Sequence, residues 1–169
     1  FGFTTFIGAI EDWCGEEAFD LISMVQVVAH FRDLRQALSK AREATNPHGL
    51  WLIETWDFQS LLARVFGRAW HEYSPPTVVN WFSRSSLEKG AGQCGMKMIA
   101  AGKPKKSVTV RHAASLVSHS ISKMGLRSST KSTPLWIPES LLLPYPALDV
   151  FWMLFQRQEN GFRRDEMWT

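Results

Sequence analysis

Two apolar runs of strand length, separated by one amphipathic helix, are the feature that most constrains the fold of this chain. The first, FDLISMV at Phe19–Val25, has no helical spacing and predicts a strand buried on both faces of a sheet. Asp33 is a residue type that can cap a helix. After it, apolar residues recur at spacings of three and four, which indicates an amphipathic helix: Leu34, Ala37, Leu38, Ala41 and Ala44. The second run, LWLIETW at Leu50–Trp56, again has the length of a buried strand.

The turn NPHG at Asn46–Gly49 separates the helix from the second strand. Proline cannot continue the helix, and we expect Gly49 to take the left-handed conformation that ends it. Strand, helix and strand joined by short turns form a βαβ unit, whose strands pair in parallel through a right-handed crossover. The pattern therefore predicts an α/β protein with these two strands parallel and adjacent.

Further segments extend this α/β pattern along the chain. We expect strands at residues 4–10, 96–102, 106–112 and 148–156, and helices at residues 58–67, 83–95 and 113–125. A polar loop is expected at residues 125–134, and a charged, frayed tail at residues 159–169. Residues 1–158 then form one domain.

Composition and charge exclude several classes of protein. Of the 169 residues, 45% are hydrophobic and 21% are charged, which is typical of a folded domain rather than a disordered chain. The net charge of +3 is too small to indicate nucleic-acid binding. The longest apolar run, ALDVFWMLF, is about half the length of a membrane span. Cys14 and Cys94 have no metal-ligand spacing and are typical of free thiols, so we expect a cytoplasmic protein.

Four stretches occur in an order and spacing that resemble a known family. They read FDLISMVQVVAHFRDL, ALSKAREATNPHGLWLIET, SLLARVFGRAWHEYSPPTVVNWFSRSSLEK and PYPALDVFWMLFQRQ. Together they resemble the C-terminal two-thirds of a class I S-adenosylmethionine-dependent methyltransferase of the small-molecule group, which includes the ubiquinone-biosynthesis type. The resemblance implies a three-layer Rossmann-like methyltransferase fold, truncated at its N-terminus, with an insert at about residues 57–95 that shapes the acceptor pocket.

The resemblance also implies a function and a set of site residues. The function is methyl transfer from S-adenosylmethionine to a small-molecule acceptor, with His30 as the catalytic base. The implied cofactor-binding residues follow two strands, and the implied substrate-binding residues lie in the insert. The cofactor set is Ala9, Ile10, Glu11, Asp12, Met24, Val25 and Gln26, and the substrate set is Trp70, His71 and Tyr73.

Several positions depart from the family pattern. The glycine-rich cofactor loop and the acidic ribose ligand would both precede Phe1, so we expect the first part of the parent protein to be missing. The acid that meets the adenine amino group would fall at Ala9, and Val78 replaces a common histidine. Members of the family that bind a metal use glutamates where this chain has Gln26 and Ala29. Because hard cations need oxygen ligands, we expect no metal.

Each candidate residue also has a structural interpretation. His30 and Gln26 could be satisfied polar groups that close a strand–helix turn, with the histidine buried and bonded to a backbone carbonyl. Glu11 and Asp12 could belong to a solvated loop. The aromatic set at Trp70, His71 and Tyr73 could pack as a lid or core.

Two other functions remain open. The chain could be a degenerate, non-catalytic methyltransferase fold that binds a partner, or a Rossmann oxidoreductase. The presence of the glycine-rich loop in the parent gene separates the enzyme from the degenerate fold. If the loop and its strand are absent, Phe19–Val25 has an unpaired edge, and we expect weak cofactor binding and self-association.

Overall fold

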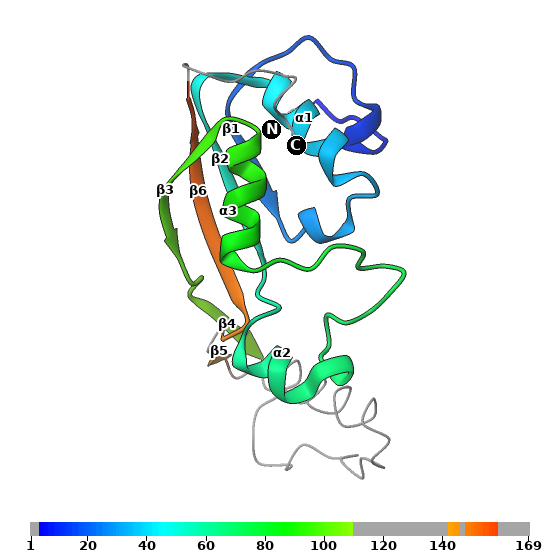
Figure 1. The fold of residues 1–169 in the computed structure, drawn as a ribbon, viewed down its shortest axis with the longest axis vertical. Coiled ribbons are helices and arrows are strands. Elements are labelled where there is room, and N and C mark those ends of the chain that lie inside the picture. Colours follow the sequence, from blue (N-terminus) through cyan, green and yellow to red (C-terminus); the bar gives the residue numbers. More distant parts are fainter. Residues whose placement is uncertain (1–3, 110–141, 146–147, 159–169) are drawn as a thin grey trace.

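The computed structural model of the protein describes residues 4–109, 142–145 and 148–158 (Figure 1). In chain order the elements are η1 (Ile10–Asp12), β1 (Phe19–Val25), η2 (Val28–His30), α1 (Leu34–Glu43), β2 (Thr45–Trp56), α2 (Leu61–Phe66), η3 (Gly67–Ala69), α3 (Arg84–Gln93), β3 (Met96–Gly102), β4 (Lys106–Thr109), β5 (Leu142–Tyr145) and β6 (Val150–Arg157). The three η elements are 3-10 helices of one turn.

Four of the strands form one sheet in the order β1-β2-β6-β3. Strands β1 and β2 are parallel and adjacent, with Val25 opposite Glu54, which confirms the predicted βαβ unit. Strand β6 enters between β2 and β3 and is antiparallel to both. Strands β4 and β5 form a separate antiparallel pair, so the strand expected at residues 106–112 is present over its first four residues.

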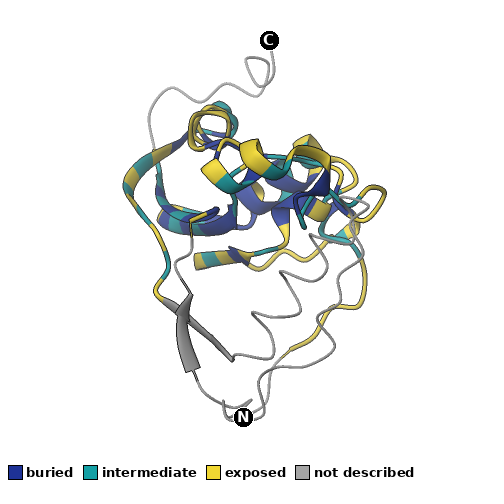
Figure 2. Ribbon diagram, turned by 90° about the horizontal axis from the view of Figure 1, so that it is seen from below, coloured by how far each residue is buried: buried dark blue, intermediate teal, exposed yellow. Residues whose placement is uncertain are grey.

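The core lies between the sheet and two helices on one of its faces. Helices α1 and α3 lie on the same side of the sheet in Figure 1. Their apolar faces pack against the sheet face that carries Trp51 and Phe155, and Figure 2 shows the buried segments gathered there. The predicted stripe of α1 is confirmed, since Ala37, Leu38 and Ala41 are buried, and Asp33 caps the helix by accepting from the backbone N–H of Gln36 at 3.0 Å.

The opposite face of the sheet is less covered. Leu52 on β2 and Trp152 and Leu154 on β6 point to this face and are half-buried. Because side chains alternate along a strand, these residues stand between the fully buried Ile53, Phe151 and their neighbours. The described residues thus supply the sheet and one helix layer of the expected three-layer arrangement.

Strand β1 is an edge strand, and the expectation that it is buried on both faces was wrong. Among the described residues it pairs only with β2. Leu21 is 53% exposed and Val25 is 47% exposed, whereas Met24 faces the helices and is buried. An apolar strand run therefore predicted the strand but not its burial, because burial depends on which elements lie beside it.

The strand expected at residues 4–10 is absent from the described part of the chain. Residues before η1 form an irregular segment that packs on α1 and β1, and together they line an apolar cavity of about 390 Å³. Its lining includes Phe6, Ile10, Trp13, Phe19 and Ile22. A β-rich composition makes a strand only where a neighbouring strand can pair with it.

The segment Asn46–Gly49, expected as a turn, lies within β2, and its left-handed residue differs from the expected one. His48, not Gly49, has a positive φ, at 62°. Gly49 is required by space instead, because a Cβ there would lie 2.7 Å from Cγ2 of Thr45 and 2.9 Å from the carbonyl oxygen of Asn46. The short helix ended by Gly67, which has a φ of 51°, is confirmed as α2.

Other expected elements are either present or outside the described residues. The helix expected at residues 83–95 is α3, which begins with a capping box between Ser83 and Ser86, and the strands expected at residues 96–102 and 148–156 are β3 and β6. The helix at residues 113–125, the loop at residues 125–134 and the tail at residues 159–169 lie outside the described residues.

The exposed edge of β1 leads to a testable prediction about association. Leu21→Lys should make the isolated chain more monomeric at equal concentration, because a lysine on an edge strand opposes pairing with another strand. Leu21 is already half exposed, so the fold should tolerate the change. Light scattering after size exclusion measures the mass. Val65→Lys, on the exposed face of α2, adds the same charge away from a strand edge, and an equal effect there would refute the edge explanation.

Candidate active site

Polar side chains gather where the parallel strands end. Gln26 follows β1 directly, Glu54 stands two residues before the end of β2, and Asp149 directly precedes β6. Because β6 is antiparallel to β2, its first residue Val150 pairs with Trp56, so Asp149 lies at the same edge of the sheet. In open parallel sheets, ligands bind outside this edge.

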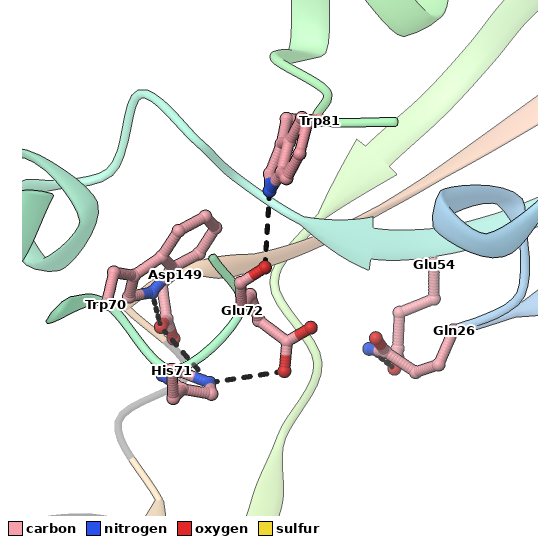
Figure 3. Close-up of polar contacts among 7 residues, drawn as sticks. All are labelled: Gln26, Glu54, Trp70, His71, Glu72, Trp81 and Asp149. Atoms are coloured by element: carbon pink, nitrogen blue, oxygen red, sulfur yellow. Dashed lines mark hydrogen bonds and ion pairs between the residues drawn. The ribbon is translucent and has the colours of Figure 1, made fainter. Parts of the chain in front are cut away.

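Gln26 and Glu54 form a fixed pair at this edge. The side-chain amide of Gln26 donates to Oε1 of Glu54 at 2.9 Å (Figure 3). The backbone N–H of Gln26 also donates to the carbonyl oxygen of Glu54, at 2.8 Å. Gln26 also has a left-handed φ of 59°, which is uncommon for a residue other than glycine. Strained backbone of this kind concentrates at functional sites.

His30 lies at the end of η2 and is exposed. Its Nδ1 lies 2.7 Å from the carbonyl oxygen of Thr77. A carbonyl oxygen can only accept, so the neutral ring carries its proton on Nδ1, and Nε2 keeps the lone pair of a base. The carbonyl bond matches the structural interpretation of His30, but the ring is at the surface rather than buried.

Hydrogen bonds join the turn that carries His30 to the insert at about residues 57–95. The carbonyl oxygen of Ala29 accepts from the backbone N–H groups of Val79 and Asn80, at 3.0 and 3.1 Å. The side-chain amide of Asn80 donates to the carbonyl oxygen of Phe31 at 2.8 Å. The segment from Thr77 to Asn80 therefore holds the backbone on both sides of His30.

The aromatic residues expected to bind substrate take different positions. Trp70 is buried, and its indole N–H donates to Oδ2 of the fully buried Asp149 at 3.0 Å (Figure 3). Nε2 of His71 lies 3.6 Å from Oε1 of Glu72 and 3.9 Å from Oδ2 of Asp149. The His71 ring also meets Trp56 edge-on, with 4.7 Å between ring centroids. Trp70 therefore has the packing expected of a core residue.

Tyr73 lies apart from this buried cluster and stacks on Trp81, with ring centroids 5.3 Å apart. The indole N–H of Trp81 donates to the carbonyl oxygen of Glu72 at 3.2 Å. Trp81 also lines an open groove of about 880 Å³ between α1 and α3, together with Arg32, Asn80 and Phe82. Trp70, His71 and Tyr73 do not line this groove.

Glu11 and Asp12 lie on η1 beside the start of α1. Glu11 is buried, with 3% of its surface exposed, so it is not part of a solvated loop. Its Oε1 accepts from the backbone N–H of Asp33 at 3.1 Å. Asp12 is exposed and lies 3.8 Å from the guanidinium of Arg32. The structure thus places Glu11 at the N-terminus of α1, where a carboxylate stabilises a helix.

Burial alone would raise the pKa of Glu11. The backbone N–H groups of Asp33, Glu11 and Arg32, together with the charge of Arg32, outweigh it and hold the pKa below its ordinary value of 4.5. A depressed pKa means that the ionised form stabilises the folded state. This contribution is present above pH 4.5 and is lost as the pH falls through the folded-state pKa.

Glu11→Gln should lower the free energy of unfolding by about 1 kcal/mol at pH 7, because the charged hydrogen bond is lost. Urea titrations at pH 7 and at progressively lower pH would show the difference shrinking as the pH falls through the folded-state pKa, below which Glu11 is protonated in both states. Asp12→Asn is the matched control, since an exposed ion pair is typically worth less than about 1 kcal/mol. A loss that is the same at every pH would contradict the assignment.

The other four predicted cofactor-binding residues, Ala9, Ile10, Met24 and Val25, have no strong side-chain hydrogen-bonding group. The Met24 side chain packs in the core, and Val25 points outward on the edge strand. The carbonyl oxygen of Ala9 accepts from the backbone N–H of Asp12, and that of Ile10 accepts from Trp13. Roles for Ala9, Ile10, Met24 and Val25 in cofactor binding stay predictions.

Metal-binding and cysteine chemistry receive no positive indication from the described residues. No cluster of three or more His, Cys, Asp or Glu side chains is found among them. Cys14 and Cys94 are free thiols. Burial raises the pKa of the Cys94 thiol to about 11, against the opposing charge of Arg42, so it is a poor nucleophile. No helix among the described residues is long and apolar enough to cross a bilayer.

Comparison with known proteins decides the family. The model of a methyltransferase domain family matches residues 6–101, which is more than half of the chain. The chain belongs to this methyltransferase domain family. The recognition as a class I S-adenosylmethionine-dependent methyltransferase and the α/β Rossmann-like fold are confirmed. No curated protein sequence matches the chain.

Solved structures show the same fold at low sequence identity. A Thermotoga maritima S-adenosylmethionine-dependent methyltransferase, described as a possible histamine N-methyltransferase, matches with a TM-score of 0.53 and 16% identity over 89% of this chain. The YcgJ protein of Bacillus subtilis matches with a TM-score of 0.55 and 14% identity over 90% of this chain. The methyltransferase chain spans 62% of the first structure and 70% of the second.

Sequence reasoning missed several residues of this edge. Glu54 and Asp149 were treated as parts of apolar strand runs, and Asn80 was not singled out. A signal was available for Glu54, because a carboxylate inside the run LWLIETW needs a polar partner when it is buried. No comparable signal pointed to Asn80, whose contacts join segments 49 residues apart.

Proposed function

We propose that this chain transfers a methyl group from S-adenosylmethionine to a small-molecule acceptor, as the acceptor-side portion of a longer parent protein. The observation that carries the proposal is His30, an exposed histidine at the carboxyl edge of the parallel strands whose Nδ1 faces the Thr77 carbonyl oxygen. The family match supports the reaction type.

The chemistry asks little of the protein beyond alignment and one proton. S-adenosylmethionine supplies a methyl group that is already activated by its sulfonium. The protein must hold the acceptor atom in line with it and remove a proton from an acceptor hydroxyl or amine. Nε2 of His30 takes this proton, and the Thr77 carbonyl stabilises the resulting imidazolium through Nδ1–H.

The residues present fit part of a cofactor site. Gln26, after β1, carries a buried side-chain oxygen that has no hydrogen-bond partner among the described residues, so it can receive an N–H group of a ligand. The glycine-rich loop and the acidic ribose ligand are not recognisable in these 169 residues. We therefore assign them to the rest of the parent protein, consistent with the 62% of the Thermotoga structure that this chain spans.

The groove beside the turn of His30 supports a small-molecule acceptor. Its lining includes Asn80, which belongs to the segment that holds the turn of His30, and the adjacent Trp81. We keep His71 and Tyr73 as predicted substrate-binding residues. The ring of His71 packs against Trp56, and the ring of Tyr73 packs against Trp81. We place the protein in the cytoplasm, where Cys14 and Cys94 stay reduced, and expect no nucleic-acid or metal partner.

The direct test is methyl transfer by the full-length parent protein. The protein is incubated with S-adenosylmethionine labelled in its methyl group and a panel of small-molecule phenols, amines and carboxylates. Label in a product, together with stoichiometric S-adenosylhomocysteine, supports the enzyme. A full-length protein that binds no S-adenosylhomocysteine in calorimetry would instead establish the non-catalytic alternative.

A further inference from the structure

The groove between α1 and α3 combines an apolar floor with charged rims. The two helices lie on the same face of the sheet (Figure 1), and the groove between them has a volume of about 880 Å³. Leu38 of α1 and Leu87 of α3 line it and are almost fully buried, and Trp81 adds an aromatic side chain. Sites for small molecules are mostly apolar cavities of roughly 300–1,000 Å³ with a few polar groups, so this groove has the size and character of one.

The charged residues of the groove are mainly cationic. Among the described residues that line it, Arg32, Arg35 and Lys89 carry positive charge and Asp33 carries negative charge. The carboxylate of Asp33 is already used by the protein, because its Oδ1 accepts from the backbone N–H of Gln36 as the cap of α1. A water-accessible groove with an excess of one charge attracts ligands of the opposite charge, which here means anions.

The ion pair of Arg32 leaves its guanidinium accessible to a ligand. Its guanidinium lies 3.8 Å from Oδ1 of Asp12, but the two side chains are 74% and 63% exposed. An ion pair this exposed contributes little free energy, so an anionic ligand in the groove can replace Asp12. A guanidinium also binds a carboxylate or a phosphate through two parallel N–H groups, which favours such a ligand.

The groove begins at the turn that carries His30. Asn80 lines the groove, and its backbone N–H and its side-chain amide donate to the carbonyl oxygens of Ala29 and Phe31, the two neighbours of His30. Arg32 follows two residues after His30 and also lines the groove. A molecule held in the groove therefore lies against the turn of the proposed base.

We infer that this groove binds a methyl acceptor that has an aromatic body and an anionic group, either a carboxylate or a phosphate. Arg32, Arg35 and Lys89 bind the anionic group, and the aromatic body packs on Trp81 and the apolar floor. The three cationic residues thereby determine specificity, since a neutral acceptor of the same shape lacks their contribution. The inference rests on the proposed function, because it names the class of the acceptor.

The test is calorimetric binding to the full-length parent protein in the presence of S-adenosylhomocysteine. The probes are hydroxybenzoates, hydroxycinnamates and indole carboxylates, each paired with its uncharged amide, and aryl phosphates, each paired with the free phenol. At least one anionic probe should bind roughly 10-fold more tightly than its neutral partner, and the difference should shrink as the salt concentration is raised. The series that shows the larger difference identifies the anion as carboxylate or phosphate. If every charged probe binds no better than its partner, the inference is wrong.

Two charge substitutions test the rims of the groove. Lys89→Gln and Arg35→Gln should each weaken binding of the preferred anionic probe roughly 10-fold and leave its neutral partner unchanged, because one charge-assisted hydrogen bond is lost. Lys97→Gln is the matched control, since Lys97 is exposed on β3 and does not line the groove. An equal loss in Lys97→Gln would show general attraction by net charge and would contradict a site in the groove.

Two glycines of α3 provide a test that leaves the charges unchanged. Gly90 lines the groove and Gly92 does not, and a Cβ at either position would have no other heavy atom within 4 Å. Gly90→Phe should therefore fill the groove and abolish binding of the anionic probe, whereas Gly92→Phe should bind it as the wild type does. Thermal melts establish that both variants fold. If Gly90→Phe binds normally, the acceptor does not occupy the groove.

Methyl transfer separates this inference from the proposed function. A full-length protein that methylates neutral acceptors as well as their anionic partners would overturn the inference and leave the proposed function standing. A full-length protein that binds no S-adenosylhomocysteine and methylates no acceptor would overturn both.

Discussion

Replacing His30 with alanine should lower the turnover of the full-length protein by roughly 10²–10⁴-fold, the usual contribution of a general base. Cofactor affinity should stay nearly intact, because the hydrogen bond of the ring is made to the Thr77 carbonyl oxygen, which lies outside the strands. Methyl transfer from labelled S-adenosylmethionine gives the turnover, and calorimetry with S-adenosylhomocysteine gives the affinity.

The His30→Ala substitution removes the hydrogen bond to Thr77, so its effect on folding must be measured separately from its effect on turnover. Ala29 and Asn80 still hold the turn through backbone and amide hydrogen bonds when the ring is removed, so the variant should fold. His48→Ala is the control, because His48 is exposed and lies in the first part of β2, at the opposite end of that strand. A fully active His30→Ala protein would exclude the base, and a loss of folding without a separate kinetic effect would favour the structural interpretation.

The isolated 169-residue chain should bind S-adenosylmethionine weakly or not at all, whereas the full-length protein should bind it at least 100-fold more tightly. The resemblance implies two sets of cofactor-binding residues, and only the predicted set at Ala9–Asp12 and Met24–Gln26 is recognisable in this chain. Losing several charged or bidentate hydrogen bonds at about 1.5–3 kcal/mol each readily accounts for a difference of this size.

Isothermal titration of both proteins under one set of conditions measures this difference. The open edge of β1 requires a control for association, since aggregated chain would also fail to bind. Leu21→Lys serves this purpose if it restores a monomer. Low-micromolar binding by the monomeric chain would show that its cofactor site is built differently from that of the family.

Local patterns in the sequence determined most of the elements. The stripe from Leu34 to Ala44 and the cap at Asp33 specify α1, and the flanking apolar runs specify β1 and β2 as a parallel pair. These features depend on residues close together in the chain, so spacing and capping chemistry are enough to read them. The family resemblance then predicts a site at the carboxyl edge of these strands.

Tertiary structure alone decided what each polar residue contacts. Glu11 lies against α1, Trp70 is fixed by Asp149, and Glu54 faces Gln26, and each pair is separated by 22 to 79 residues in the chain. The burial of β1 was likewise decided by its position at the edge of the sheet. Side-chain burial and hydrogen bonding depend on which distant segments meet, and a local pattern carries no information about that meeting.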